Sequence, residues 1–232
     1  MKYDIVILSY SKTVEHIKVT RQCIDSLLSA KNKIGVNIYV IESYDPTIKY
    51  TGAKTTYFSE KTFNYNRSMN KGFSFTTNQY VFFCNNDLVF YDDWADNCYH
   101  VFKMGYDSLS PYCPVSHPRF ITDGNYAVAG YQVGFMVAGW CIGVNRDMFE
   151  RIGGFNEAVT FWYSDNLYAE QLKIAEVKHA LVCNSFVKHL DFGSKTLKTM
   201  SANEKTRMTS AQKSKYDKEV KKLYAKKEKV LR

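Results

Sequence analysis

The sequence lacks any long hydrophobic run, although 45% of its 232 residues are hydrophobic. No stretch reaches the roughly 18 consecutive apolar residues typical of a membrane-spanning helix, so we expect no transmembrane segment. The apolar run that begins at Ile5 is too short for a signal peptide. No internal repeat is visible. A chain of this length and composition is expected to form one sizeable core rather than two full domains. We expect the protein to be cytoplasmic.

Paired cysteines are also missing. The six cysteines include no pair with the CxxC spacing of zinc and redox sites, and several of them stand in apolar runs. This usage is typical of buried, reduced thiols in a cytosolic protein, and it argues against a disulfide framework or a zinc site.

Acidic residues are too few near the C-terminus to balance the basic ones. Residues 201–232 hold eleven lysines and arginines against four acidic residues, so they carry +7 of the formal net charge of +8. Ser201 and Glu204 form a capping-box pattern, and a one-sided stripe of apolar or aromatic residues follows. We therefore expect a catalytic-type domain over 1–198 and a basic amphipathic helix over 199–232.

The sequence does contain a regular alternation of strand and helix patterns. Short apolar runs typical of buried strands alternate with segments of helical spacing from the N-terminus onward. This alternation predicts an α/β fold in which a mostly parallel central sheet is flanked by helices. Residues 109–115, with two prolines, are expected to form an extended edge. The expected strands are 4–9, 36–41, 55–58, 80–84, 133–144 and 180–189, and the expected helices are 14–29, 63–75, 94–104, 145–152 and 163–175.

The strand pattern Tyr80–Cys84 ends abruptly at Asn85-Asn86-Asp87. A carboxylate at the carboxyl end of a central strand lies where open α/β sheets bind their ligands. Asp87 is a hard oxygen donor of the kind that Mg²⁺ and Mn²⁺ prefer, which makes it the first candidate metal ligand. The same three residues also suit an ordinary turn, and their composition alone does not decide between the two interpretations.

The order of several segments resembles the family 2 glycosyltransferases, which have the GT-A fold. The most specific match is Phe-Glu-Arg-Ile-Gly-Gly-Phe-Asn-Glu at 149–157, which is similar to the family's iGGFdE loop. Cys-Asn-Asn-Asp at 84–87 stands where the family has its DxD motif, and Val-Lys-His at 187–189 matches its closing vxH. The resemblance covers about residues 1–192, and its other pieces are 5–11, 40–43, 64–72 and 161–167.

This resemblance implies a transferase that moves a sugar from a nucleotide-diphosphate sugar, such as a UDP-sugar, to an acceptor hydroxyl. It implies a nucleotide-sugar half at about 1–92 and an acceptor half at about 93–198. Asp87, with His189 as a second ligand, would hold Mn²⁺ or Mg²⁺ against the diphosphate. Asp165 would be the general base of an inverting transfer. The residues alone also allow His189 to be a half-buried strand-end histidine and Asp165 to be a helix N-cap.

The resemblance also implies a set of donor contacts. Glu42, at the end of the second strand, would accept hydrogen bonds from ribose hydroxyls or a base N–H, and Tyr10 would stack on the base. Ordinary loop, strand-end and solvated helix positions remain alternatives for the whole set. The other expected donor contacts are Ser9 at the base, Arg67, Asn70 and Lys71 at the base or phosphates, and Asn86 at the ribose or sugar.

Aromatic residues around Asp165 are expected to shape a sugar or acceptor pocket. Trp140 would form its apolar floor, although core packing explains this residue equally well. Trp162 and Tyr163 would supply a partly apolar setting, which raises the pKa of a carboxylate toward neutrality and makes it a better base.

The chain departs from the family pattern at three positions, which bear on acceptor handling more than on the overall class. Asn85 replaces the first aspartate of the DxD motif, and Ser164 replaces the glutamate that usually precedes the catalytic aspartate. The arginine expected shortly after is absent, with Gln171 nearby. These departures motivate an alternative function, a non-catalytic module that binds a sugar nucleotide or a nucleic acid.

The basic C-terminal helix offers the one indication of the acceptor. Its lysines would contact phosphates of DNA, for a transferase that modifies a hydroxylated base, or an anionic membrane, for one that builds envelope or capsular glycans. A solvated helix that merely packs on the domain is the third interpretation. The lysines proposed for this contact are Lys213, Lys218, Lys221 and Lys222.

Overall fold

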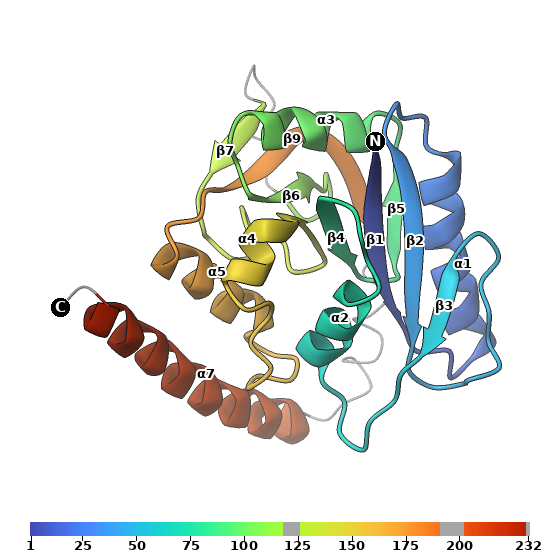
Figure 1. Cartoon of the computed structure of the whole chain (residues 1–232). Coiled ribbons are helices and arrows are strands. Elements are labelled where there is room, and N and C mark those ends of the chain that lie inside the picture. The colour runs from blue at the N-terminus through green and yellow to red at the C-terminus, as the bar shows by residue number, and fades with distance from the viewer. Residues whose placement is uncertain (118–125, 191–201, 231–232) are drawn as a thin grey trace.

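The computed structural model describes residues 1–117, 126–190 and 202–230, with the side chains of the last segment from 209 to 228. Within these residues, nine strands form one continuous sheet that carries helices on both faces (Figure 1). This mixed α/β architecture confirms the fold class predicted from the sequence. None of the helices described combines the length and hydrophobicity that crossing a bilayer requires.

The first part of the sheet consists of four parallel strands. They are β1 (Lys2–Ser9), β2 (Gly35–Glu42), β3 (Lys54–Tyr57) and β4 (Tyr80–Cys84), in the spatial order β3-β2-β1-β4. Because the strands are parallel, β1, β2 and β4 all end at the same edge of the sheet, and Ser9 is in register with Glu42. This carboxyl edge is where ligands bind in open α/β sheets.

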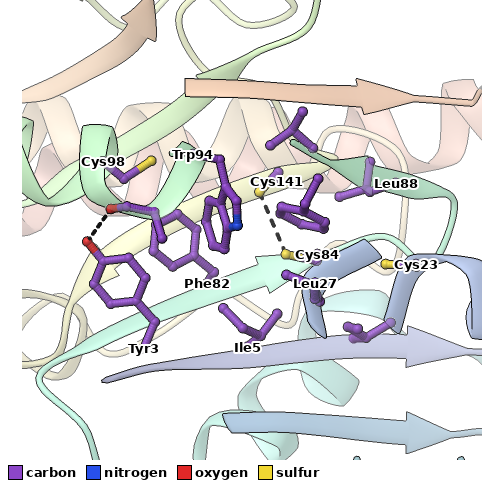
Figure 2. Packing of buried hydrophobic residues seen from close by; sticks show 14 of the residues in the cluster. Tyr3, Ile5, Cys23, Leu27, Phe82, Cys84, Leu88, Trp94, Cys98 and Cys141 are labelled. Carbon is purple, nitrogen blue, oxygen red and sulfur yellow. Dashed lines mark hydrogen bonds between the residues drawn. The ribbon is translucent and has the colours of Figure 1, made fainter. Parts of the chain in front are cut away.

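Alternation of side chains along β1 builds a core on each face of the sheet. Tyr3, Ile5 and Ile7 are fully buried against α1 (Val14–Ser29) and α3 (Trp94–Lys103). Figure 2 shows this core, in which Tyr3 and Phe82 of β4 point toward Trp94 of α3. The side chain of Val6 points the other way, into the second core. That core is closed by α2 (Tyr65–Phe73), α4 (Arg146–Arg151) and α5 (Ser164–Ile174).

The second part of the sheet mixes directions. It contains β5 (Leu88–Phe90), β6 (Ser108–Tyr112), β7 (Ala127–Ala129), β8 (Cys141–Asn145) and β9 (His179–His189). β8 runs antiparallel to β4 and to β6, β6 is parallel to β9, and β5 and β7 pair with β9 antiparallel. The full order is β3-β2-β1-β4-β8-β6-β9-β5, with β7 on β9.

Two predictions for this part were wrong. The predicted edge at 109–115 is the interior strand β6, whose five residues are all buried between β8 and β9. It tolerates Pro111 because the pairing with β9 is irregular after this residue. The predicted strand 133–144 is a strand only from Cys141, since Gly134 has a φ of 78° and the preceding chain turns. The six cysteines are buried free thiols, as expected, and Cys84 and Cys141 face each other across β4 and β8.

Helix α7 (Ala202–Val230) lies along the outside of the molecule and packs on α5 (Figure 1). Gln212 and Thr160 exchange two hydrogen bonds of 2.9 Å, and the Tyr224 hydroxyl donates to Glu170 at 2.9 Å. The ring of Tyr216 stacks on that of Tyr163. The predicted C-terminal helix is present, and its aromatic stripe faces the domain.

Candidate active site

The turn after β4 places Asp87 beside the end of β9. The pairing of β5 with β9 sets Leu88 opposite His189, and the Leu190 amide donates to the Asp87 carbonyl at 2.8 Å. Asp87 is 3% exposed, and its Oδ1 lies 3.2 Å from Nε2 of His189. Two residues far apart in the sequence therefore present a carboxylate oxygen and an imidazole nitrogen to the same point.

This pair fits a divalent cation. Adjacent ligands of an octahedral Mg²⁺ are about 3 Å apart when each metal–ligand bond is about 2.1 Å, which is close to the observed separation. Among the described residues, no group of three or more His, Cys, Asp or Glu side chains is arranged to hold a metal. Mg²⁺ is usually bound by one or two protein groups together with substrate phosphates and water, so two protein ligands are sufficient for such a site.

Trp140 borders the candidate metal site. Its indole stacks on the His189 ring with 5.6 Å between centroids and 17° between planes, and its carbonyl accepts a 2.9 Å hydrogen bond from the Asn85 amide. Its other ring neighbour is His117, at 5.9 Å. The half-buried Trp140 thus contacts the candidate metal site directly, through the ring of His189.

Asp165 lies in the first turn of α5 and points at the backbone of Gly139. A Cβ atom on Gly139 would lie 2.9 Å from Oδ2 of Asp165, so only glycine allows this approach. Desolvation by burial raises the pKa of Asp165, more than the hydrogen bond from the Asn166 amide at 2.9 Å lowers it. The N-cap alternative is wrong, because the N-cap position belongs to Tyr163, with a φ of 65°.

Tyr65, at the start of α2, reaches both Asn85 and the backbone of Gly139. Its hydroxyl lies 3.4 Å from Oδ1 of Asn85 and 3.5 Å from the Gly139 carbonyl. Burial raises its pKa, and the charges of Asp165 and Asp87 both act on it in the same direction. The backbone at Gly139 and Trp140 joins the two carboxylates, because Asp165 packs on Gly139 and Trp140 stacks on His189, the neighbour of Asp87. Sequence reasoning did not single out Tyr65, because nothing in its local pattern distinguishes it from a core aromatic residue.

A separate pocket of about 320 Å³ opens beside the ends of β1, β2 and β3. Tyr10, predicted to stack on a base, lines it with 46% of its surface exposed and contacts Tyr44 edge-on. The other aromatic residues in its wall, Phe58 and Phe63, were not predicted. A signal existed, since Phe58 is the last residue of a predicted strand and Phe63 is the first residue of the predicted second helix. The remaining lining residues are Ser43, Ser59, Glu60, Lys61, Asn64 and Ser68.

Glu42 is fully buried behind this pocket. Its Oε1 accepts hydrogen bonds from the Ser11 hydroxyl at 2.8 Å and from the Tyr44 amide at 2.8 Å, and so orders both loops. Its Oε2 is buried and has no hydrogen-bond partner among the described residues. A buried carboxylate oxygen without a donor is costly, so Oε2 is a candidate acceptor for a ligand N–H or O–H.

Two predicted donor contacts are turned inward instead. The Ser9 side chain is fully buried, and its hydroxyl bonds to Tyr50 at 2.9 Å and to Thr20 at 3.2 Å, so the strand-end alternative holds for it. The Asn86 amide donates to the Thr20 hydroxyl at 2.8 Å. Both side chains tie the carboxyl edge to α1, because their polar groups find partners there.

The predicted contacts on α2 are likewise engaged within the protein. Asn70 donates to the Phe155 carbonyl at 2.8 Å and accepts from the Phe155 amide at 3.0 Å, which fastens the loop after α4. Arg67 binds the carboxylates of Glu60 and Glu157. Lys71 is exposed over the ring of Phe75. The segments 64–72 and 149–157, which both resemble family motifs, therefore bind each other. Asn70 and Arg67 serve as the structural links.

The two aromatic residues predicted for the acceptor pocket differ in position. Trp162 is half-buried and contacts Phe161 edge-on. Tyr163 stacks on Tyr216, at 5.3 Å between centroids, so its ring packs on α7 rather than over Asp165. Together with α7 it borders an open groove of about 780 Å³, which contains the four lysines proposed for acceptor contact.

No family model matches the chain, and no curated protein sequence matches it. Among solved structures, the chain is similar to S. aureus TarS 1–349, a family 2 glycosyltransferase with a GT-A-like fold. The two share 10% sequence identity at a TM-score of 0.58, and the match covers 93% of this chain and 72% of that chain. The chain therefore has the fold of this glycosyltransferase.

Proposed function

We propose that the chain is a glycosyltransferase that moves a sugar from a nucleoside diphosphate donor, first among them a UDP-sugar, to an acceptor hydroxyl. One observation carries the proposal. Asp165 packs on Gly139, and the next residue, Trp140, stacks on His189, whose Nε2 lies 3.2 Å from Asp87, at the carboxyl edge of a sheet with the fold of a glycosyltransferase. A cation-binding carboxylate and a base beside each other are what transfer from a sugar diphosphate requires.

The donor would be held by residues on both sides of β1. A base in the 320 Å³ pocket would lie against Tyr10 and Tyr44. Oε2 of Glu42 would accept its N–H or a ribose hydroxyl, because this buried oxygen has no other donor among the described residues. Asp87 and His189 would bind Mn²⁺ or Mg²⁺, which supplies positive charge for the departing diphosphate.

Asp165 would accept the proton of the acceptor hydroxyl. As the acceptor oxygen bonds to the anomeric carbon, the bond from that carbon to the diphosphate breaks, and its electron pair leaves on the phosphate oxygen. A single base acting on the side opposite to the leaving group makes the transfer inverting. Burial raises the pKa of Asp165, and a base with a pKa nearer neutrality removes a hydroxyl proton more effectively.

For the acceptor, a hydroxylated base in DNA is our first candidate, and an envelope or capsular glycan at a membrane surface is the alternative. A non-catalytic module that binds sugar nucleotides or nucleic acid is a second candidate function, favoured by Asn85 and Ser164 at positions where the family has acids.

Release of nucleoside diphosphate from a panel of sugar nucleotides separates catalysis from binding. The full-length protein is incubated with each donor in Mn²⁺, and in parallel with EDTA. We expect slow hydrolysis of at least one donor with Mn²⁺ and none with EDTA. If no donor turns over in a metal-dependent way, with or without DNA or glycan acceptors, the catalytic proposal is wrong and the binding module replaces it.

A further inference from the structure

The groove between Tyr163 and α7 has a strongly basic wall. Four lysines line it, and the rest of its lining is polar apart from the tyrosine ring. Lys213 and Lys222 form ion pairs along the helix with Asp217 and Glu219. Lys218 and Lys221 form no ion pair with any residue that the structure describes. Asp217 also lines the groove, as the one acidic residue among its lining, and the other lining residues are Thr209, Ser210 and Ser214.

Along the described side chains of the same helix, 209–228, the apolar stripe is turned toward the domain. Tyr216, Val220 and Leu223 are each half-buried, and the stacking of Tyr216 on Tyr163 shows which way this stripe faces. An amphipathic helix binds a bilayer by burying its apolar face between the headgroups, so a helix whose stripe already packs on its own domain lacks that contribution. The side chains exposed along 209–228 are mostly lysine, serine and alanine, together with Tyr224 and Glu228.

We infer that this lysine-lined groove binds the phosphodiester backbone of DNA. The lysines from 213 to 222 extend over about 13 Å of helix, at 1.5 Å per residue. Successive phosphates of one strand follow each other every ~3.4 Å along the duplex axis, so the row can meet several of them. Lysine is a point charge without the planar fork that reads base edges, so binding would not depend on base sequence.

The position of the groove relates it to the candidate active site. Tyr163 forms its wall and is followed at once by Ser164 and Asp165, the first turn of α5. The groove wall and the candidate base are thus two residues apart in the sequence, at the start of α5. That the bound DNA is also the acceptor rests on the proposed function, whereas the binding itself does not.

Binding of the full-length protein to a fluorescent DNA duplex, without any donor, tests the inference. The test variant replaces Lys218, Lys221 and Lys222 by Gln. A matched control replaces the exposed Lys31 and Lys33, which precede β2, and the exposed Lys103, which ends α3, by Gln. A third variant replaces the same three groove lysines by Arg. Each is measured over a range of salt concentrations, next to vesicles of phosphatidylserine and phosphatidylcholine.

We expect the groove variant to bind DNA about tenfold or more weakly, with the slope of log K against log salt reduced by up to about 3. The control and the Arg variant should bind as the unchanged protein does. Equal losses in the groove variant and the control would overturn the inference, and so would unchanged binding in the groove variant. Binding to vesicles but not to DNA would overturn it in favour of a membrane. Because no donor is present, none of these results depends on transferase activity.

Discussion

The Nε2 atom of His189 lies 3.2 Å from Oδ1 of Asp87, across the short pairing of β5 with β9. The arrangement is supported from outside by Trp140, whose indole stacks on the imidazole. Asp87 lies between β4 and β5, His189 ends β9, and the pairing of β5 with β9 brings them together. A cation held here would sit at the carboxyl edge, near Tyr65 and Asp165.

Replacing Asp87 by Asn tests the metal site. The amide keeps the shape of the side chain but removes its charge, so we expect Mn²⁺ affinity in the presence of UDP to fall tenfold or more by calorimetry, as a rough figure for loss of a charged ligand. Metal-dependent donor turnover should fall with it. The exposed Asp25, changed to Asn, is the control and should alter neither quantity. Unchanged Mn²⁺ affinity in the Asp87 variant would remove Asp87 from the site.

Replacing Asp165 by Asn tests the general base. We expect turnover to fall by about 10²–10⁴-fold while donor affinity stays the same, because the carboxylate acts on the acceptor proton and not on the donor. The change keeps the acceptor atom that receives the Asn166 amide. Donor affinity is measured by calorimetry and turnover by release of the nucleoside diphosphate. A variant that binds donor and turns over normally would exclude this assignment.

The raised pKa of Asp165 also predicts how stability depends on pH. Burial favours the neutral carboxyl in the folded state, so the folded pKa lies above the unfolded value. The stability that this group contributes is fully present below the unfolded pKa and is lost as pH rises through the folded pKa. Urea unfolding at several pH values should therefore show that, as pH rises, the free energy of unfolding of the Asp165→Asn variant increases relative to that of the unchanged protein. A difference independent of pH would contradict the predicted shift.

A change of Asn70 to Ala distinguishes a structural link from a nucleotide contact. The Asn70 amide makes hydrogen bonds to both backbone groups of Phe155, and their loss should lower the free energy of unfolding by about 2 kcal/mol. The neighbouring exposed Lys71, changed to Ala, should cost less than about 0.5 kcal/mol. Urea unfolding measures both. An Asn70 variant of normal stability with weakened donor binding would restore the nucleotide role.

A change of Glu42 to Gln tests the buried oxygen behind the nucleotide pocket. The Gln carbonyl can still accept the hydrogen bonds from Ser11 and Tyr44. Its NH₂ group then takes the place of Oε2 and faces the N–H of the base, and two hydrogen-bond donors cannot pair. Affinity for the nucleotide should therefore fall by roughly 10–100-fold, in line with the cost of an unpaired buried polar group. Calorimetry with UDP alone checks this. Unchanged UDP affinity, with thermal stability preserved, would place the base elsewhere.

Local patterns predicted several elements with accuracy. The strand Tyr80–Cys84 and the helix Val14–Ser29 have the predicted bounds, because an unbroken apolar run and a helical stripe are properties of consecutive residues. By contrast, β5 (Leu88–Phe90) was not predicted. Three residues are too few for a pattern, and this strand exists because β9 provides its hydrogen-bond partners.

The candidate site likewise contains residues that the local sequence indicated and residues that only the tertiary contacts reveal. Asp87 and Asp165 stood out because each follows a recognisable segment, and the resemblance of ordered segments supported them. Tyr65 did not stand out, since its importance comes from neighbours at Asn85 and Gly139, which belong to other parts of the chain. Asn70 stood out for the wrong role, because the sequence does not show that its amide reaches Phe155.

The sequence by itself determined the alternation of strands and helices, the buried free thiols and the basic C-terminal helix, since each depends on composition or on residues close together in the chain. Only the tertiary structure decided that β6 lies inside the sheet, that Asp165 packs on Gly139, and that the apolar stripe of α7 is covered by α5. These relationships join residues distant in sequence, and hydrogen-bond pairing and side-chain packing between elements select them.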